Sequence, residues 1–152
     1  MLAASFLELI ARGVPESFLF VYSVYMLSNS KFNKKLYFLT STILVVVTFF
    51  IRRLPISYGI HTILNIILLV ILTTYINKIY ILESIKAGII TTIIMLICEG
   101  INMVFIQCIE GKNIFQIFLN PIAKILYGLP SLIIFLVVIL IIRFTLYKKE
   151  EK

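Results

Sequence analysis

The residues that could do chemistry are charged and polar side chains set within long apolar stretches. His61 is the only histidine in the chain, and Glu99 is the only charge in the apolar stretch 87–108. A charge at the centre of a bilayer costs roughly 2.5–3.5 kcal/mol even on the lowest scales, so it turns towards other helices and pairs there. We expect one polar cluster, formed by Arg12, Glu16, Arg52, Arg53, His61, Asn65, Glu99 and Asn102.

The chemistry available to this cluster is limited. A metal site needs several His, Cys or carboxylate ligands, and a single histidine does not supply them. A His61–Cys98 pair of base and nucleophile is a possible arrangement, but the sequence has no phosphate loop, zinc-protease motif or serine elbow. We therefore predict a non-enzymatic protein with no cofactor and no metal. A purely structural role, in which the cluster only joins helices, stays open.

Composition places these residues in a membrane protein. Hydrophobic residues make up 61% of the 152 residues, whereas soluble domains contain about 45–50% apolar residues. Several uncharged runs are long enough to cross a bilayer. We predict an all-α polytopic bundle of about five transmembrane helices in a single domain, 1–152. The expected spans are 4–28, 36–53, 57–77, 87–108 and 125–146.

The first predicted span is interrupted by Gly13-Val14-Pro15. A proline inside a helix removes a backbone donor and clashes with the carbonyl four residues earlier, so we expect a kink there. In an unbroken helix, residues spaced by four share a face, which would place Arg12 beside Glu16. Arg12 then has two candidate partners, Glu16 and Glu99. Cys98 and Cys108 would lie roughly 15 Å apart along one helix, too far apart for a disulfide.

Depth in the bilayer groups the polar residues further. At 1.5 Å per residue, His61 lies roughly 8 Å and Glu99 roughly 13 Å from the same membrane surface. Arg52 and Arg53 lie at the mouth of this region. Asn65 comes four residues after His61 and Asn102 comes three after Glu99, so each shares a helix face with its neighbour. The expected cluster therefore occupies one half of the bundle.

The net charge of +7 marks the orientation of the chain. Cytoplasmic loops are enriched in Lys and Arg, so these bases indicate topology and not a nucleic acid partner. With the N-terminus outside and the C-terminus inside, nine bases lie on the inner side and five on the outer side. The outer five are Arg12, Arg52, Arg53, Lys112 and Lys124. With this orientation the polar cluster lies in the outer half of the membrane. The abundance of Ile, Lys and Asn is typical of AT-rich bacterial genomes, so we expect a bacterial cell membrane.

Two stretches look familiar: Ala11-Arg12-Gly13-Val14-Pro15-Glu16-Ser17 and Arg52-Arg53-Leu54-Pro55-Ile56-Ser57-Tyr58-Gly59-Ile60-His61-Thr62. They resemble the multi-helix sensor region of clostridial histidine kinases of the accessory-gene-regulator type. The resemblance covers about the first two thirds of the chain and implies detection of a peptide signal. That family commonly has six or more spans and continues into a kinase part, which these residues do not contain. A signal would then leave through a partner protein.

The leading hypothesis is a membrane sensor or regulatory subunit that binds a ligand or partner in the outer half of the bundle. The alternative is a small transport component, a substrate-binding subunit coupled to an ATPase. The expected partners are the lipid bilayer and a kinase, a regulator, an ATPase subunit or a second copy of the chain. Arg12, Arg52 and Arg53 outnumber Glu16 and Glu99, so an anionic small molecule or peptide is the expected ligand.

Overall fold

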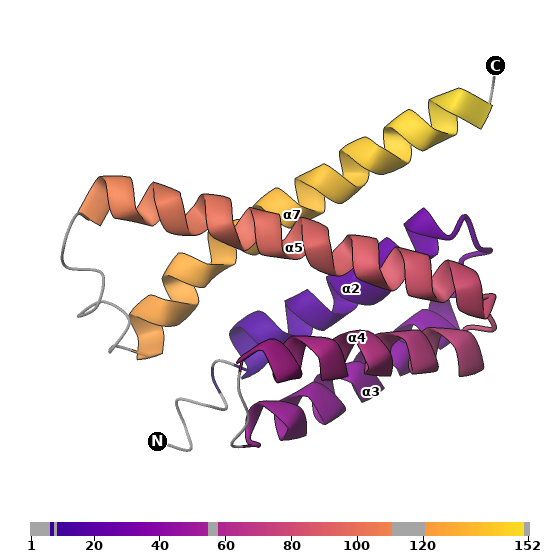
Figure 1. The fold of residues 1–152 in the computed structure, drawn as a ribbon, viewed down its shortest axis with the longest axis horizontal. Coiled ribbons are helices and arrows are strands. Elements are labelled where there is room, and N and C mark those ends of the chain that lie inside the picture. Colours follow the sequence, from indigo (N-terminus) through magenta and orange to yellow (C-terminus); the bar gives the residue numbers. More distant parts are fainter. Residues whose placement is uncertain (1–6, 8, 55–57, 111–120, 151–152) are drawn as a thin grey trace. The chain divides into compact units, whose positions relative to one another are not determined.

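The computed structural model describes residues 7, 9–54, 58–110 and 121–150. These residues form a π-helical turn, η1 (Leu9–Gly13), and five α-helices (Figure 1). The α-helices are α2 (Val14–Leu27), α3 (Lys34–Arg52), α4 (Tyr58–Tyr75), α5 (Ile81–Glu110) and α7 (Pro121–Glu150). The all-α prediction is confirmed. The start of the predicted first span and the residues around Pro55 lie outside the described residues.

Three helices are long and apolar enough to cross a membrane. They comprise Lys34–Arg52 in α3, Ile81–Ile109 in α5 and Ile125–Thr145 in α7. Gly59–Tyr75 in α4 is a shorter apolar helix. A multi-pass membrane protein is therefore plausible from these helices alone. Both cysteines are free, as predicted from their spacing.

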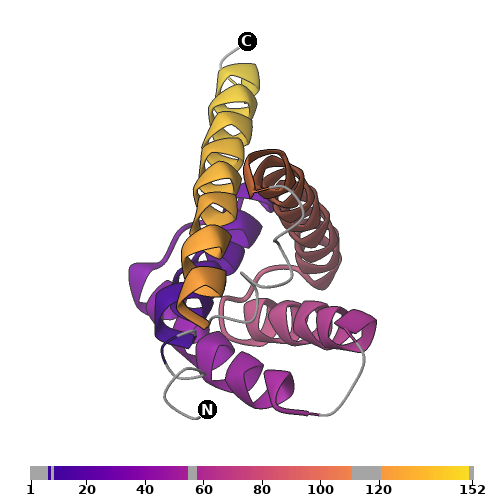
Figure 2. The same cartoon turned by 90° about the vertical axis from the view of Figure 1, so that its left-hand side faces the viewer.

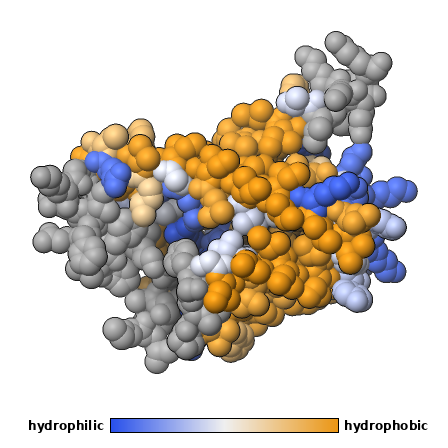
Figure 3. Space-filling view, in the orientation of Figure 1, coloured by the Kyte–Doolittle hydropathy of each residue, from blue (hydrophilic) through white to orange (hydrophobic). Residues whose placement is uncertain are grey.

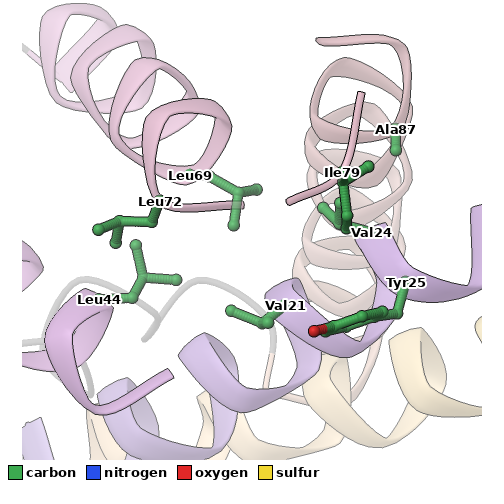
Figure 4. Packing of buried hydrophobic residues seen from close by; sticks show 8 residues of the cluster. All are labelled: Val21, Val24, Tyr25, Leu44, Leu69, Leu72, Ile79 and Ala87. Atoms are coloured by element: carbon green, nitrogen blue, oxygen red, sulfur yellow. The ribbon is translucent and has the colours of Figure 1, made fainter. Parts of the chain in front are cut away.

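The chain divides into two compact units, Gly13–Thr92 and Met1–Arg12 with Ile93–Lys152. Each unit is described by itself, and the single domain 1–152 stays a prediction. In the unit 13–92, helices α2, α3 and α4 pack on one another around an apolar core (Figures 1 and 2). Figure 4 shows Val21, Leu44, Leu69 and Leu72 at the centre of this core, directed towards the space between the helices.

Helix α3 is more polar on its buried side than on its exposed side. Thr40, Leu44 and Thr48 occur at intervals of four residues and are buried. Phe38 and Phe50, in contrast, have 57% and 62% of their surface exposed. In water this pattern would be unfavourable, because apolar surface would be hydrated. In lipid it is favourable, because small polar residues pack helices closely and hydrogen-bond across them.

Some buried hydroxyl groups of this unit bond to carbonyls or amides in ways that suit a bilayer, whereas others, such as those of Ser41 and Thr91, have no partner among the described residues. Ser23 and Thr73 each donate to the carbonyl four residues earlier in their own helix, at 2.7 Å. Thr40 Oγ1 instead donates to Asn77 Oδ1 at 2.7 Å, and this bond is buried. It joins the first turns of α3 to the segment directly after α4. The bundle is thus held by small side chains and short polar contacts.

One end of the unit 13–92 is basic and aromatic. Asn29 and Lys78 adopt positive φ angles of 49° and 56°, which let the chain reverse sharply after α2 and after α4. Phe32, in the first reversal, contacts the rings of Tyr22, Tyr25 and Tyr37. Five exposed lysines belong to the same end, namely Lys31, Lys34, Lys35, Lys78 and Lys86. Figure 3 shows hydrophilic side chains gathered there, beside hydrophobic flanks.

We predict that Thr40→Val lowers the free energy of unfolding by about 1–2 kcal/mol, because a buried acceptor on Asn77 is left unpaired. Thr42 is the matched control, since it is exposed on the same helix and donates only to the carbonyl of Phe38. Thr42→Val is expected to change stability by no more than about 0.5 kcal/mol. Far-UV circular dichroism of the protein unfolding in micelles measures both values, and equal losses would contradict the prediction.

Candidate functional site

A charged pair forms the centre of the unit that joins residues 9–12 to residues 93–150. The guanidinium of Arg12 pairs with the carboxylate of Glu99 on α5. Their side chains are 19% and 34% exposed, so neither charge is fully solvated. Pairing offsets much of the cost of placing these two charges among apolar helices. This pair is one of the two that the sequence left open for Arg12.

The local backbone departs from an unbroken α-helix between Arg12 and Pro15. Pro15 has no N–H to offer the carbonyl of Ala11, so the α-helical hydrogen-bond ladder cannot continue there. Residues Leu9–Gly13 form a π-helical turn instead, and α2 begins at Val14 with proline in its first turn. A π turn is wider than an α turn. The four-residue rule, which assumes an unbroken α-helix, therefore does not apply directly to Arg12 and Glu16.

Helix α7 carries a proline within its length, Pro130. Proline cannot donate to the carbonyl of Leu126, and its ring disturbs the preceding turn. Two neighbouring carbonyls of that turn receive side-chain donors. Asn102 Nδ2 on α5 donates to the carbonyl of Tyr127 at 2.7 Å, and Ser131 Oγ donates to the carbonyl of Gly128, also at 2.7 Å. Membrane helices tolerate proline where such donors satisfy the backbone.

Arg12 also lies against this disturbed turn of α7. A Cβ atom added to Gly128 would lie 2.9 Å from Nη1, 3.3 Å from Cζ and 3.5 Å from Cδ of Arg12. The absence of a side chain at Gly128 is therefore what lets the guanidinium reach the helix backbone. Arg12, Glu99, Asn102, Gly128 and Pro130 form one connected site, which we call the α7 break site.

The remaining predicted residues lie in the unit 13–92. Arg52 Nη2 and Glu16 Oε2 are 2.9 Å apart, so they form a second ion pair. The guanidinium carbon of Arg53 lies 4.3 Å from the centre of the Phe49 ring, a cation–π contact. Thr48 Oγ1 lies 3.5 Å from Asn65 Oδ1. His61 Nδ1 is buried, and among the described residues it has no hydrogen-bond partner.

These contacts divide the predicted set into two groups. Arg12, Glu99 and Asn102 meet at the α7 break site, whereas Glu16 pairs with Arg52 in the other unit. A single cluster of all eight residues stays a prediction. The two ion pairs also account for two of the three arginines that favoured an anionic ligand.

Sequence reasoning missed Gly128 and Pro130. The signal was present, because Gly128-Leu129-Pro130 interrupts the predicted fifth span, 125–146. A glycine and a proline two residues apart within an apolar run mark a helix that needs outside donors. What the sequence could not supply was the partner, since Asn102 lies on another helix.

No protein-family description, curated protein or solved structure matches this chain. The functional proposal therefore rests on the geometry of the site.

We predict that Gly128→Ala disturbs the α7 break site, because the new methyl group would collide with the guanidinium that Glu99 holds. Gly100 on α5 is the matched control, since a Cβ there would meet nothing within 4 Å. Gly100→Ala should gain up to about 1 kcal/mol from helix propensity, and Gly128→Ala should instead lower the melting temperature. Thermal unfolding in micelles measures both variants, and an equal gain would contradict the clash.

Proposed function

We propose that this chain is a non-enzymatic sensor or regulatory subunit of a bacterial cell membrane. It would cross the membrane five times, with the N-terminus outside and the C-terminus inside, and bind its ligand in the outer half of the bundle. The observation that carries the proposal is the α7 break site. There, an ion pair, a glycine without a side chain and a proline-disturbed helix meet among apolar residues.

The charged pair of this site supports a functional role. Helices α2, α3 and α4 pack around an apolar core with small hydroxyl side chains, and one ion pair, Arg52–Glu16, joins α3 to α2. Such packing suffices to hold membrane helices together. The α7 break site also contains a charged pair, which must lose part of its hydration when it forms. Charges within a membrane most often serve binding, transport or signalling.

The alternative is a small transport component coupled to an ATPase, and one observation favours it. Transporter binding sites are commonly built at interrupted membrane helices, where backbone groups become available. Helix α7 is continuous but contains Pro130, which removes one backbone donor, and Asn102 donates to the carbonyl of Tyr127. Both functions use the same site and differ in the event that binding triggers. A kinase, a regulator, an ATPase subunit or a second copy of the chain would receive the effect.

The orientation is supported by the basic end of the unit 13–92. Its five lysines and its aromatic rings combine the two marks of a membrane interface. An excess of lysine favours the cytoplasmic side. Arg52 and Arg53 lie at the other end of α3, which would then face outwards.

We predict that a cysteine at each end of α3 reacts differently with a membrane-impermeant maleimide. In a background without Cys98 and Cys108, Leu54→Cys should react on intact cells, because the site is exposed and faces outwards. Asn33→Cys should react only after the membrane is permeabilised. The opposite pattern would reverse the orientation, and equal labelling of both sites would show that α3 does not cross the membrane.

The function itself is tested by Glu99→Gln, with Gln107→Ala as the control on the same helix, since Gln107 is exposed. A sensor subunit should co-purify stoichiometrically with a signalling protein from native membranes, and Glu99→Gln should change its output while the control does not. A transport subunit should instead co-purify with an ATPase and support ATP-dependent uptake of a labelled solute into vesicles. If Glu99→Gln lowers only the melting temperature, the site is structural and both functions fail.

A further inference from the structure

The surroundings of Arg12 resemble those of a bound cation. Its guanidinium contacts a carboxylate on α5 and lies against the Gly128 backbone on α7, while Arg12 itself belongs to neither helix. It comes instead from the π-helical turn before α2. Such turns are rare and occur most often at functional sites. The two helices thus supply the site, and a separate segment supplies its occupant.

The shape of the site favours a guanidinium group over an ammonium group. Nη1, Cζ and Cδ of Arg12 all lie within 3.5 Å of the position that a Gly128 Cβ would take. A flat group can lie along the helix in that space, and its forked N–H donors suit a carboxylate such as that of Glu99. An ammonium is compact and strongly hydrated, so it would use neither the flat surface nor the fork.

The turn of α7 at this site has side-chain donors other than Arg12. The carbonyl of Tyr127 accepts from Asn102, and the carbonyl of Gly128 accepts from Ser131. These donors fix the turn of α7 that contacts the guanidinium. A site whose supporting groups are already fixed binds a ligand with little further ordering.

We propose that Glu99 and the Gly128 turn of α7 form a guanidinium-binding site, which Arg12 occupies in this structure. A ligand that carries a guanidinium group, such as a small guanidine or an arginine side chain of a peptide, competes with Arg12 for it. This inference rests on the proposed function and names the ligand class. Arg12 acts as an internal competitor, so binding displaces its side chain from Glu99 and from the Gly128 turn.

The experiment uses the full chain in lipid nanodiscs, with Cys98 as the reporter. Cys98 is adjacent to Glu99 and only 2% exposed, so its reaction with a maleimide reports opening of the site. Cys108 is exposed and is replaced by serine. In this background, Arg12→Ala should speed the reaction of Cys98 by about tenfold, as expected when a partly buried pair loses one partner. Millimolar ethylguanidinium should reverse this change in a saturable way.

Three controls make the result specific. Ethylguanidinium should not slow the reaction of Cys98 in Arg12→Ala/Glu99→Gln, which lacks the carboxylate. Ethylammonium should not replace ethylguanidinium. Arg53→Ala removes an arginine that lies over Phe49 in the other unit, and it should leave the reaction of Cys98 unchanged. N-acetylarginine amide, added in place of ethylguanidinium, separates the sources: rescue by both supports peptide arginine, and rescue by ethylguanidinium alone supports small guanidines.

The proposal is overturned if ethylguanidinium fails to rescue Arg12→Ala, or if it rescues the double variant equally. If Arg12→Ala does not fold, Arg12→Gln takes its place, and failure of both to fold with ethylguanidinium present also counts against the site. The test is independent of any partner. Rescue without a co-purified signalling protein or ATPase leaves the binding site but removes the proposed function. If a partner protein responds to Glu99→Gln but ethylguanidinium does not rescue Arg12→Ala, the proposed function stands and the guanidinium-binding site is removed.

Discussion

A charge placed among apolar helices needs a partner within the protein, and the Arg12–Glu99 pair meets this constraint. Each neighbouring feature is tied to this pair. Arg12 lies in the π-helical turn, and Gly128 leaves room for its guanidinium against α7. Glu16 then pairs with Arg52 instead. The charges are thus distributed so that these two arginines each have a carboxylate.

The chain satisfies its polar groups in two different ways. In the unit 13–92, hydroxyl groups such as those of Ser23 and Thr73 bond within their own helices, and the helices pack around them. In α7, Pro130 removes a backbone hydrogen-bond donor, and the side chain of Asn102 donates to a nearby backbone carbonyl, that of Tyr127. The second arrangement depends on particular residues, above all Asn102 and Gly128.

Much of the fold could be predicted from the sequence, because apolar runs and charge breaks define helices in a membrane protein directly. Arg12 and Glu99 stood out for the same reason, as charges beside or within such runs. Their pairing could not be fixed, because the four-residue rule assumes an unbroken α-helix and Leu9–Gly13 is π-helical. The role of Asn102 also escaped prediction, because its acceptor is a backbone carbonyl on α7 whose availability depends on Pro130.

The sharp reversals at Asn29 and Lys78 have a consequence for how the chain would enter a membrane. They leave little chain between α2 and α3, or between α4 and α5, so neighbouring helices would insert as hairpins. Thr40 of α3 can find Asn77 only after α4 has also been inserted. Until then its hydroxyl depends on its own helix. The order of synthesis thus becomes an order of assembly, with cross-helix bonds forming last.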